Sequence, residues 1–248
     1  MRGAATARKK YTAGRRKAKA GDRLPRQACI DIPAVYRKLF AAHGKQHWWP
    51  GDSAFEIMAG AVLTQNTAWT NVARAIANLK QAKVLSPEAI VGAQPKRLAA
   101  WLRPSGYFNI KAQRLRAMCR WLIERGGVKK LKKIPTSELR HALLAVHGIG
   151  PETADDILLY AFQRPVFVID AYTRRIFTRL GLIEGSENYE TLRHLFENAL
   201  ETDVAMFNEY HALIVAHGKN ICRKRPMCGS CRLADDCPYS AVFMHASN

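Results

Sequence analysis

The amino-acid sequence predicts an all-α protein. Runs of β-branched residues that alternate with polar ones, the pattern of a half-buried strand, are nearly absent from its 248 residues. Apolar residues instead recur at helical spacing: Leu115, Met118, Cys119, Leu122 and Ile123 stand at i, i+3, i+4, i+7 and i+8. With 48% apolar residues the chain can bury a sizeable core without disulfide bonds.

The expected helices follow one another along the chain and are separated by proline and glycine. Helical patterns cover residues 33–43, 53–63, 69–81, 94–101, 108–125, 136–146, 154–162, 170–180, 187–200 and 203–217. The breaks include Pro50, Pro87, Pro104, Pro135, Pro165 and the pair Gly126–Gly127. One apolar run, PVFVID at residues 165–170, is short and branched enough to form a β-strand.

The net charge of +19 indicates a polyanionic partner. No apolar run approaches the roughly 20 residues that span a bilayer, so nucleic acid is a better prediction than a membrane. Residues 1–27 hold ten Lys or Arg and one acid, with few apolar residues to bury. We expect this basic tail to be disordered and to bind the DNA backbone without sequence preference, or else to be an extension with no role.

Four of the six cysteines, Cys222, Cys228, Cys231 and Cys237, are spaced C-x5-C-x2-C-x5-C. This is the spacing of a metal site, and both an iron–sulfur cluster and a four-thiolate zinc ion tolerate it. The segment RKRPM between the first two cysteines is basic, consistent with contact to phosphates. The cysteines cluster as metal ligands do, and no apolar stretch near the start could act as a secretory signal. We therefore expect the protein in a reducing cytoplasm.

The segment HGIGPETADD predicts a tight hairpin between two helices. Glycine at 148 and 150 permits positive φ, and Pro151 suits the first position of the second helix. Gly148, Ile149 and Gly150, with the free N–H groups of that helix start, would then form a phosphate site with no base preference. The same G-I-G-P sequence also links helices that bind nothing, and these residues alone leave both interpretations open.

Residues 143–182, LLAVHGIGPETADDILLYAFQRPVFVIDAYTRRIFTRLGL, resemble the helix-hairpin-helix, Gly/Pro-rich loop and aspartate (HhH-GPD) of the endonuclease III superfamily of DNA glycosylases. GAVLTQNTAWTNV, GYFNIKAQRL and the cysteine segment resemble the same family in the same order, over roughly residues 33–240. The wording of LTQNTAWTNV, RPSGYFNIKAQRL and GIGPETAD is closer to the endonuclease III-like 3-methyladenine DNA glycosylases than to endonuclease III.

The resemblance implies a two-lobed helix-hairpin-helix glycosylase fold. A barrel of about six helices over residues 54–164 would carry the hairpin, and residues 28–53 with 165–248 would form a second helical lobe with the cysteines. The base pocket would lie in the cleft between the lobes, with Asp170 at its mouth.

By this resemblance Asp170 is the catalytic residue. A fixed carboxylate stabilises a sugar that becomes cation-like as its base departs, and can orient or activate the attacking water. An Asp before a helix is also an ordinary N-cap, and N–H donors there would keep it ionised. Family members that also nick the strand carry a lysine nucleophile at the position of Glu152, and a carboxylate cannot form an imine.

Other roles come from the same resemblance. Trp48, Trp49 and Trp69 match aromatic base-pocket residues, although tryptophans beside helix starts are often core. Gln65 matches the side chain that fills the gap left by a flipped nucleotide, and Asn66 would share that work; a hydrogen-bonded boundary residue is the plainer interpretation. The four cysteines would hold a [4Fe–4S] cluster, with zinc as the alternative, although the first gap is five residues where the family has six.

The sequence therefore predicts a monofunctional DNA N-glycosylase of base excision repair that removes alkylated purines such as 3-methyladenine. We expect a monomer that acts on double-stranded DNA with a damaged base, in the cytoplasm of a bacterium and nucleoid-associated. One alternative is a bifunctional glycosylase and AP lyase for oxidised pyrimidines, which would use another lysine. The other is a non-catalytic iron–sulfur DNA-binding module.

Overall fold

The computed structural model describes residues 30–245, in which helices and loops occur and no β-strand does. The all-α prediction is confirmed, and the predicted tail of residues 1–27 lies outside the described residues. Within residues 30–245 no helix is long and apolar enough to cross a membrane. The α-helices are α1 (Ile32–His43), α2 (Ala54–Thr64), α3 (Trp69–Gln81), α4 (Pro87–Gly92), α5 (Pro95–Leu102), α6 (Phe108–Glu124), α7 (Gly127–Leu131), α8 (Thr136–Leu144), α9 (Pro151–Asp156), α10 (Ala171–Arg179), α11 (Tyr189–Ala199), α12 (Val204–Asn220) and α13 (Pro238–His245). Short helical turns are η1 (Arg103–Ser105), the π-helical η2 (Ile157–Ala161), η3 (Cys228–Ser230) and η4 (Ala234–Asp236).

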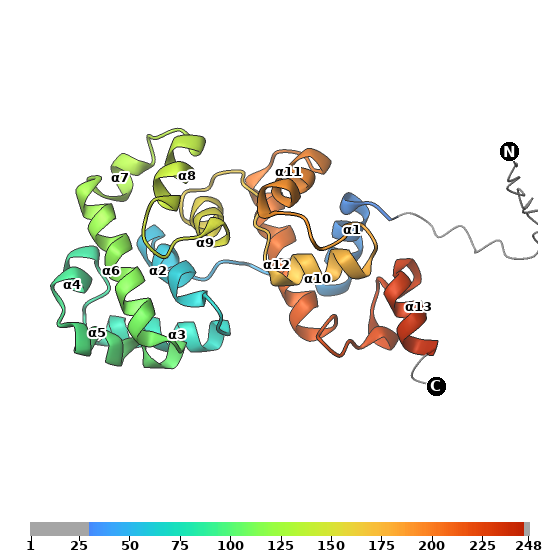
Figure 1. Ribbon diagram of the computed structural model, residues 1–248, viewed down its shortest axis with the longest axis horizontal. Coiled ribbons are helices and arrows are strands. Elements are labelled where there is room, and N and C mark those ends of the chain that lie inside the picture. The colour runs from blue at the N-terminus through green and yellow to red at the C-terminus, as the bar shows by residue number, and fades with distance from the viewer. Residues whose placement is uncertain (1–29, 246–248) are drawn as a thin grey trace, which may run out of the picture.

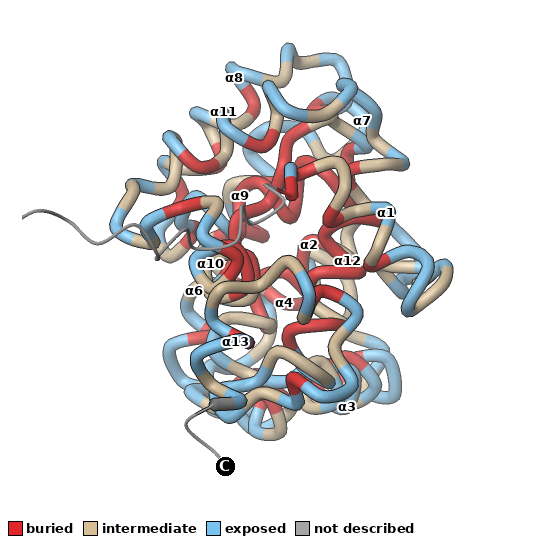
Figure 2. The backbone as a smooth tube through the Cα atoms, turned by 90° about the vertical axis from the view of Figure 1, so that its right-hand side faces the viewer, coloured by how far each residue is buried: buried red, intermediate tan, exposed pale blue. Residues whose placement is uncertain are grey.

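Figure 1 shows two lobes, with α2 to α9 in the first and α1 together with α10 to α13 in the second. The first lobe packs around α6, which contacts α2, α4, α5 and α7. Its core is mainly aliphatic, with Leu63, Leu79, Leu98, Leu115 and Leu139 fully buried. The buried backbone in Figure 2 lies inside the molecule and the exposed backbone forms the outer turns, as amphipathic helices require.

The second lobe has an aromatic core around α12, which contacts α1 and α10. The ring of Phe167 stacks on Phe196 at 4.6 Å between centroids, and Phe177 meets Phe196 edge-on at 4.7 Å. Tyr210 is also fully buried, and its hydroxyl donates to the carbonyl of Ile32 at 2.7 Å. This hydrogen bond joins α12 to the start of α1, so the two separate stretches of sequence that form this lobe pack together.

The chain crosses between the lobes twice. Residues 44–53 lead from α1 to α2, and residues 162–170 lead from η2 to α10. The second crossing contains the apolar run that suggested a strand, and no strand forms there. Val166 is buried in the first core, whereas Phe167 and Val168 are buried in the second. Burial between two lobes, rather than pairing in a sheet, accounts for these branched apolar residues.

An ion-pair network connects the lobes. Arg140 of α8 binds both carboxylate oxygens of Asp155 in α9, at 2.7 and 3.1 Å, and also Glu190 of α11 at 2.7 Å. Arg193 then bridges Glu190 and Glu197 within α11. Because the side chain of Asp155 is fully buried and its contact with arginine is bidentate, this pair fixes geometry more firmly than a surface pair would.

Candidate active site

The predicted hairpin links α8 to α9 through residues 145–150. Gly148 has φ +85°, and a Cβ there would lie 2.2 Å from Cγ of Arg114, so both backbone and space require glycine. Gly150 differs from the expectation: its φ is −91°, and a Cβ there would meet nothing within 4 Å. Pro151 occupies the first turn of α9, as predicted.

Gln65 caps the C-terminal end of α2 and is held against this hairpin. Its amide nitrogen donates to the carbonyl of Gly148 at 3.0 Å and to Oγ1 of Thr153 at 2.9 Å, and its amide oxygen accepts from Arg114. Asn66, the next residue, has φ +54° and is exposed. The two predicted wedge residues therefore differ, because Gln65 has a full set of partners within the protein and Asn66 lies in the open.

Lys111 is a buried lysine near Gln65 that was not among the site residues predicted from the sequence. It is 1% exposed, and its ammonium donates to the carbonyls of Leu63 at 2.8 Å and Ser105 at 2.6 Å. Burial, with the positive charge of Arg114, lowers the pKa of Lys111 to about 8. Its place among the apolar positions of α6 was the available signal. By binding the carbonyl of Leu63, the lysine satisfies a free acceptor at the C-terminal end of α2, two residues before Gln65.

The three predicted pocket tryptophans form one cluster. The ring centroids of Trp48 and Trp49 lie 5.6 Å apart, and Trp69 lies 6.1 and 5.2 Å from them. A Cβ at Gly60 of α2 would lie 3.2 Å from Nε1 of Trp49 and 3.4 Å from Trp69, so glycine lets both indoles pack on this helix. Tyr160 of η2 extends the cluster, at 5.0 Å from Trp49.

Asp170 is the N-cap of α10, as its sequence position suggested. Its Oδ1 accepts from the backbone nitrogen of Thr173 at 2.7 Å and from the hydroxyl of Thr173 at 2.8 Å. Its Oδ2 faces Nε2 of His211 at 3.7 Å. Burial by itself raises the pKa of Asp170, but the facing imidazole and the two donors outweigh it and hold the pKa below its usual value. The carboxylate is therefore ionised at neutral pH, and 11% of its side-chain surface stays exposed.

Two further carboxyl groups lie on α9 beside Asp170. Glu152 is exposed as a residue, but its carboxyl group is partly shielded from solvent. This desolvation, with the negative charge of Asp170, raises the pKa of Glu152 to about 7. Asp156 is buried, and its Oδ1 has no hydrogen-bond partner among the described residues. Burial and the charges of Glu152 and Asp170 raise the pKa of Asp156 well above its usual value. Environment thus separates an ionised Asp170 from neighbours that retain their protons more readily.

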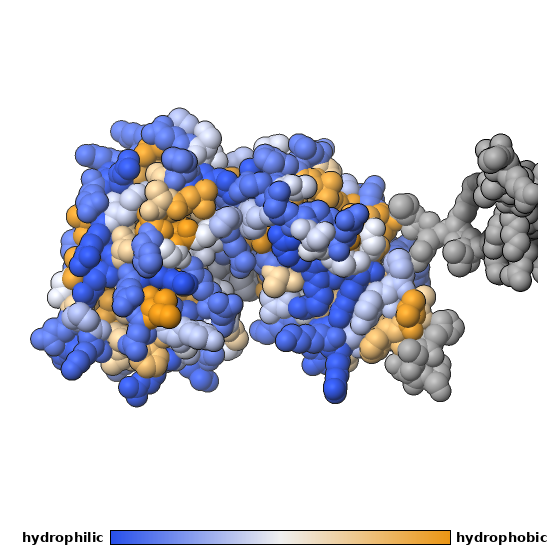
Figure 3. Space-filling view, in the orientation of Figure 1, coloured by the Kyte–Doolittle hydropathy of each residue, from blue (hydrophilic) through white to orange (hydrophobic). Residues whose placement is uncertain are grey.

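Two residues of this site could not be identified as site residues from the sequence. Tyr160 and His211 stand on apolar helix patterns 51 positions apart, and the Tyr160 hydroxyl meets Nδ1 of His211 at 2.6 Å. Figure 3 shows the visible face hollowed between the two lobes. The residues that form the aromatic cluster and the residues that flank Asp170 come from both lobes and from both connecting segments.

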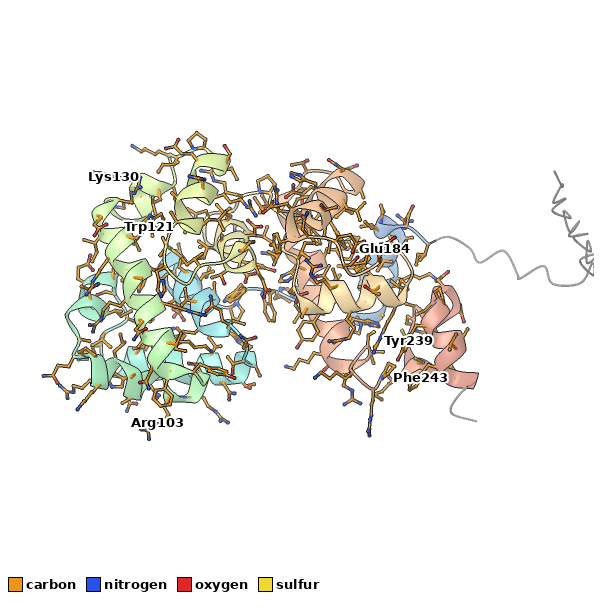
Figure 4. The ribbon with its side chains drawn as sticks, in the orientation of Figure 1. Arg103, Trp121, Lys130, Glu184, Tyr239 and Phe243 are labelled. Atoms are coloured by element: carbon orange, nitrogen blue, oxygen red, sulfur yellow. The ribbon has the colours of Figure 1, made fainter. Side chains whose placement is uncertain are left out.

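The four predicted cysteine ligands gather in the second lobe. Burial, and to a lesser degree the charges of the other three cysteines, raise the pKa of Cys231 to about 11. Arg179 donates to Sγ of Cys222 at 3.2 Å, and Nε2 of His217 lies 3.5 Å from Sγ of Cys231. Arg179 also lies 4.5 Å over the ring of Tyr239, which Figure 4 labels on the outer side of this lobe. Within residues 30–245 no three His, Cys, Asp or Glu side chains are placed to hold a single metal ion.

Comparison with known proteins gives the class. Residues 59–202, more than half of the chain, match the model of the HhH-GPD superfamily of base excision DNA repair proteins. The putative DNA repair glycosylase MJ1434 of Methanocaldococcus jannaschii is 42% identical over 83% of this chain and 95% of its own length. The H. pylori 3-methyladenine DNA glycosylase (MagIII), solved with 1,N6-ethenoadenine bound, is 30% identical, with a TM-score of 0.66 over 77% of this chain and 98% of that one.

A non-covalent endonuclease III–DNA complex matches 86% of this chain and 97% of that one, with a TM-score of 0.75 and 20% identity, which shows a shared fold. The chain belongs to the HhH-GPD superfamily of base excision DNA repair proteins. Within that class it is a DNA glycosylase of the endonuclease III superfamily, as the sequence predicted.

Proposed function

We propose that this protein is a monofunctional DNA N-glycosylase that flips alkylated purines out of duplex DNA and removes them with water as the nucleophile. The observation that carries the proposal is a carboxylate, Asp170, that His211 and Tyr160 link to a tryptophan cluster, with a carboxyl group and not an amine at position 152.

Asp170 is suited to the glycosidic step. As the C1′–N bond lengthens, the sugar gains positive charge, and an ionised carboxylate already held by Thr173 needs no rearrangement to stabilise that charge. The same carboxylate can orient a water at C1′ and accept its proton. The released base takes the bonding electron pair, and an abasic site remains.

No amine among the residues of this site is free to open the sugar. Glu152 stands where strand-nicking relatives have their lysine, and it cannot form a Schiff base. Lys111 has the lowered pKa of a candidate nucleophile, but both carbonyls that it binds lie inside the first lobe and it is almost fully buried. These observations favour hydrolysis over lyase chemistry.

The tryptophan cluster supports an alkylated purine as substrate. A methylated purine is cationic and has a weakened glycosidic bond, so electron-rich indoles attract it more strongly than a normal base. Trp48, Trp49 and Trp69 bring three indoles together, with ring centroids 5.6, 6.1 and 5.2 Å apart. The H. pylori relative was solved with a modified adenine bound, which supports a purine-sized ligand for a related chain.

Duplex DNA would be bound by a single copy of the chain. Gly148 and Gly150 would present backbone N–H groups to a phosphate, whereas the N–H of Ile149 already donates to the carbonyl of Val146 at 3.0 Å. Asn66, with Gln65 beside it, would fill the gap left by the flipped nucleotide. Gln65 would leave its hairpin partners to do so, whereas Asn66 is already exposed.

The four cysteines fit a [4Fe–4S] cluster. Each of the four thiolates would bind a different iron atom of such a cluster. When bound, the cluster would cross-link the end of α12 to the loop before α13. Purified protein should be yellow-brown and contain iron and sulfide. A colourless protein that contains one zinc ion would show that the cysteines hold zinc instead of the cluster.

Replacement of Asp170 by Asn tests the catalytic assignment. Asn keeps the shape and a cap for α10 but has no charge, so the rate of base release from methylated duplex under single-turnover conditions should fall about 100-fold or more. Abasic sites are counted by alkaline cleavage, and binding of duplex with a stable abasic analogue serves as the control. Equal rates for both proteins would remove Asp170 from the mechanism and, with it, this proposal.

Borohydride trapping tests the absence of lyase chemistry. The wild-type chain should give no covalent adduct with DNA that carries a methylated purine or an oxidised pyrimidine. The matched variant Glu152→Lys supplies an amine at the family position and calibrates the assay. A wild-type adduct would favour the bifunctional alternative.

A further inference from the structure

His211 is a buried histidine between two functional groups of the site. It lies on α12, is 4% exposed, and is remote in sequence from both neighbours. Its Nδ1 meets the hydroxyl of Tyr160 at 2.6 Å, and its Nε2 faces Oδ2 of Asp170 at 3.7 Å. Nε2 has no hydrogen-bond partner within the described residues, and the polar group that it faces is the carboxylate of Asp170.

The contact with Tyr160 determines where the imidazole carries its proton. Burial and nearby carboxylates raise the pKa of Tyr160 well above its usual value, so the phenol keeps its hydrogen and can donate it to Nδ1. A neutral His211 then carries its hydrogen on Nε2, and a protonated His211 carries one there as well. In both states an N–H points at the carboxylate, which the opposite tautomer would repel.

His211 also faces Asp170 where several other carboxyl groups surround it, and a donor there favours the ionised carboxylate. The carboxyl groups of Glu152 and Asp156 approach from α9, Tyr160 approaches from η2, and Arg174 of α10 lies near Glu152. Thr173 provides two neutral donors to Oδ1. On the Oδ2 side, the imidazole is the group that favours an ionised carboxylate.

We propose that His211 is a positioning residue that keeps Asp170 ionised and oriented toward the sugar, and that Tyr160 fixes the tautomer of His211 for this task. The inference rests on the catalytic role proposed for Asp170. Tyr160 also packs on Trp49 at 5.0 Å, so one continuous chain of contacts runs from the base pocket to the carboxylate.

The experiment measures single-turnover base release from methylated duplex as a function of pH in Tyr160→Phe, His211→Leu and His211→Gln. Loss of the donor toward Oδ2 should raise the pKa of Asp170 and move the acid limb of the profile to higher pH. We expect His211→Leu to be about 10- to 100-fold slower at neutral pH, Tyr160→Phe to shift in the same direction by less, and His211→Gln to recover part of the rate because its amide can still donate. Affinity for duplex with an abasic analogue should stay within about twofold of wild type.

Tyr210→Phe is the matched control. It also removes a buried tyrosine hydroxyl that donates at 2.7 Å, but its acceptor is the carbonyl of Ile32, away from Asp170. It should lower thermal stability and leave the acid limb unchanged. If His211→Leu does not fold, Tyr160→Phe, which loses one oxygen atom, decides the matter.

The two possible failures are distinct. If Asp170→Asn retains the wild-type rate, the proposed function itself fails. If Asp170→Asn is inactive while Tyr160→Phe and His211→Gln keep the wild-type acid limb, Asp170 acts without His211 and the inference is overturned. A slower rate that comes only with weaker DNA binding would overturn it as well.

Discussion

Asp156 is a carboxyl group with little compensation for its burial. It is 7% exposed, one of its oxygens lacks a partner among the described residues, and Glu152 and Asp170 lie near it. Its pKa is raised well above the usual value, so the folded protein retains this proton at pH values where the unfolded chain has released it. The group therefore costs stability as pH rises.

Asp156→Asn should remove this cost, because the amide has nearly the same shape and no charge. The free energy of unfolding, from urea titrations, should match wild type near pH 4 and exceed it by about 1–3 kcal/mol at pH 8, since stability tied to a raised pKa is lost with increasing pH. Equal stabilities at both pH values would contradict the raised pKa of Asp156.

Single residues could be predicted where the motif itself carries the chemistry. Asp170 follows an apolar run and precedes a helix, and the structure places it as the cap of α10. Tyr160 and His211 could not be found in this way, because their contact joins positions far apart in sequence, each of which reads as an ordinary core residue. Gln65 was predicted as a wedge, but its contacts with the hairpin depend on tertiary packing.

At the scale of elements, the hairpin between α8 and α9 has one glycine that the geometry requires and one that it does not. At Gly148 a Cβ would meet Arg114, whereas at Gly150 it would point into open space. Since Arg114 also holds Gln65, a displaced arginine would disturb the end of α2 as well.

Gly148→Ala should therefore lower the free energy of unfolding by about 1–3 kcal/mol, from positive φ and the clash with Arg114. Gly150→Ala is the matched control and should change it by less than about 0.5 kcal/mol. Urea unfolding followed by circular dichroism measures both. Similar losses in the two variants would show that the hairpin tolerates neither substitution and that Arg114 is not the cause.

Regular helices were the most predictable elements. The apolar stripe of residues 108–125 became α6, because a helix with one buried face leaves its period in the sequence. The π-turn η2 was not predictable, since the same apolar residues would fit a continued α-helix. The segment 165–170 suggested a strand because burial on two sides selects the same residues as a sheet does.

For the whole molecule, charge is the property that the sequence predicts best. Residues 1–27 contain ten basic residues and one acid, so they carry +9 of the net +19. The long-range attraction of DNA depends on such charges and is screened by salt. The tail and the rest of the chain therefore contribute almost equally to it.

Removal of residues 1–27 should weaken binding to undamaged duplex at low salt and reduce the slope of log Kd against log salt concentration. The single-turnover rate at saturating DNA should not change, because the proposed active site lies within residues 30–245. Fluorescence anisotropy over a range of salt concentrations measures the slope. An unchanged slope would mean that the tail does not touch the DNA backbone.

The double crossing between the lobes makes the first lobe an insertion within the second. Trp48 and Trp49 lie on the outward crossing, and Asp170 ends the return crossing. A protease cut in one connection would leave the lobes joined by the other. A cut in residues 44–53 would break the chain near Trp48 and Trp49, and a cut in residues 162–170 would break it near Asp170. The residues proposed for base recognition and for catalysis therefore lie on the two connections between the lobes, so a change in the angle between the lobes would alter the distance between them without unfolding either lobe.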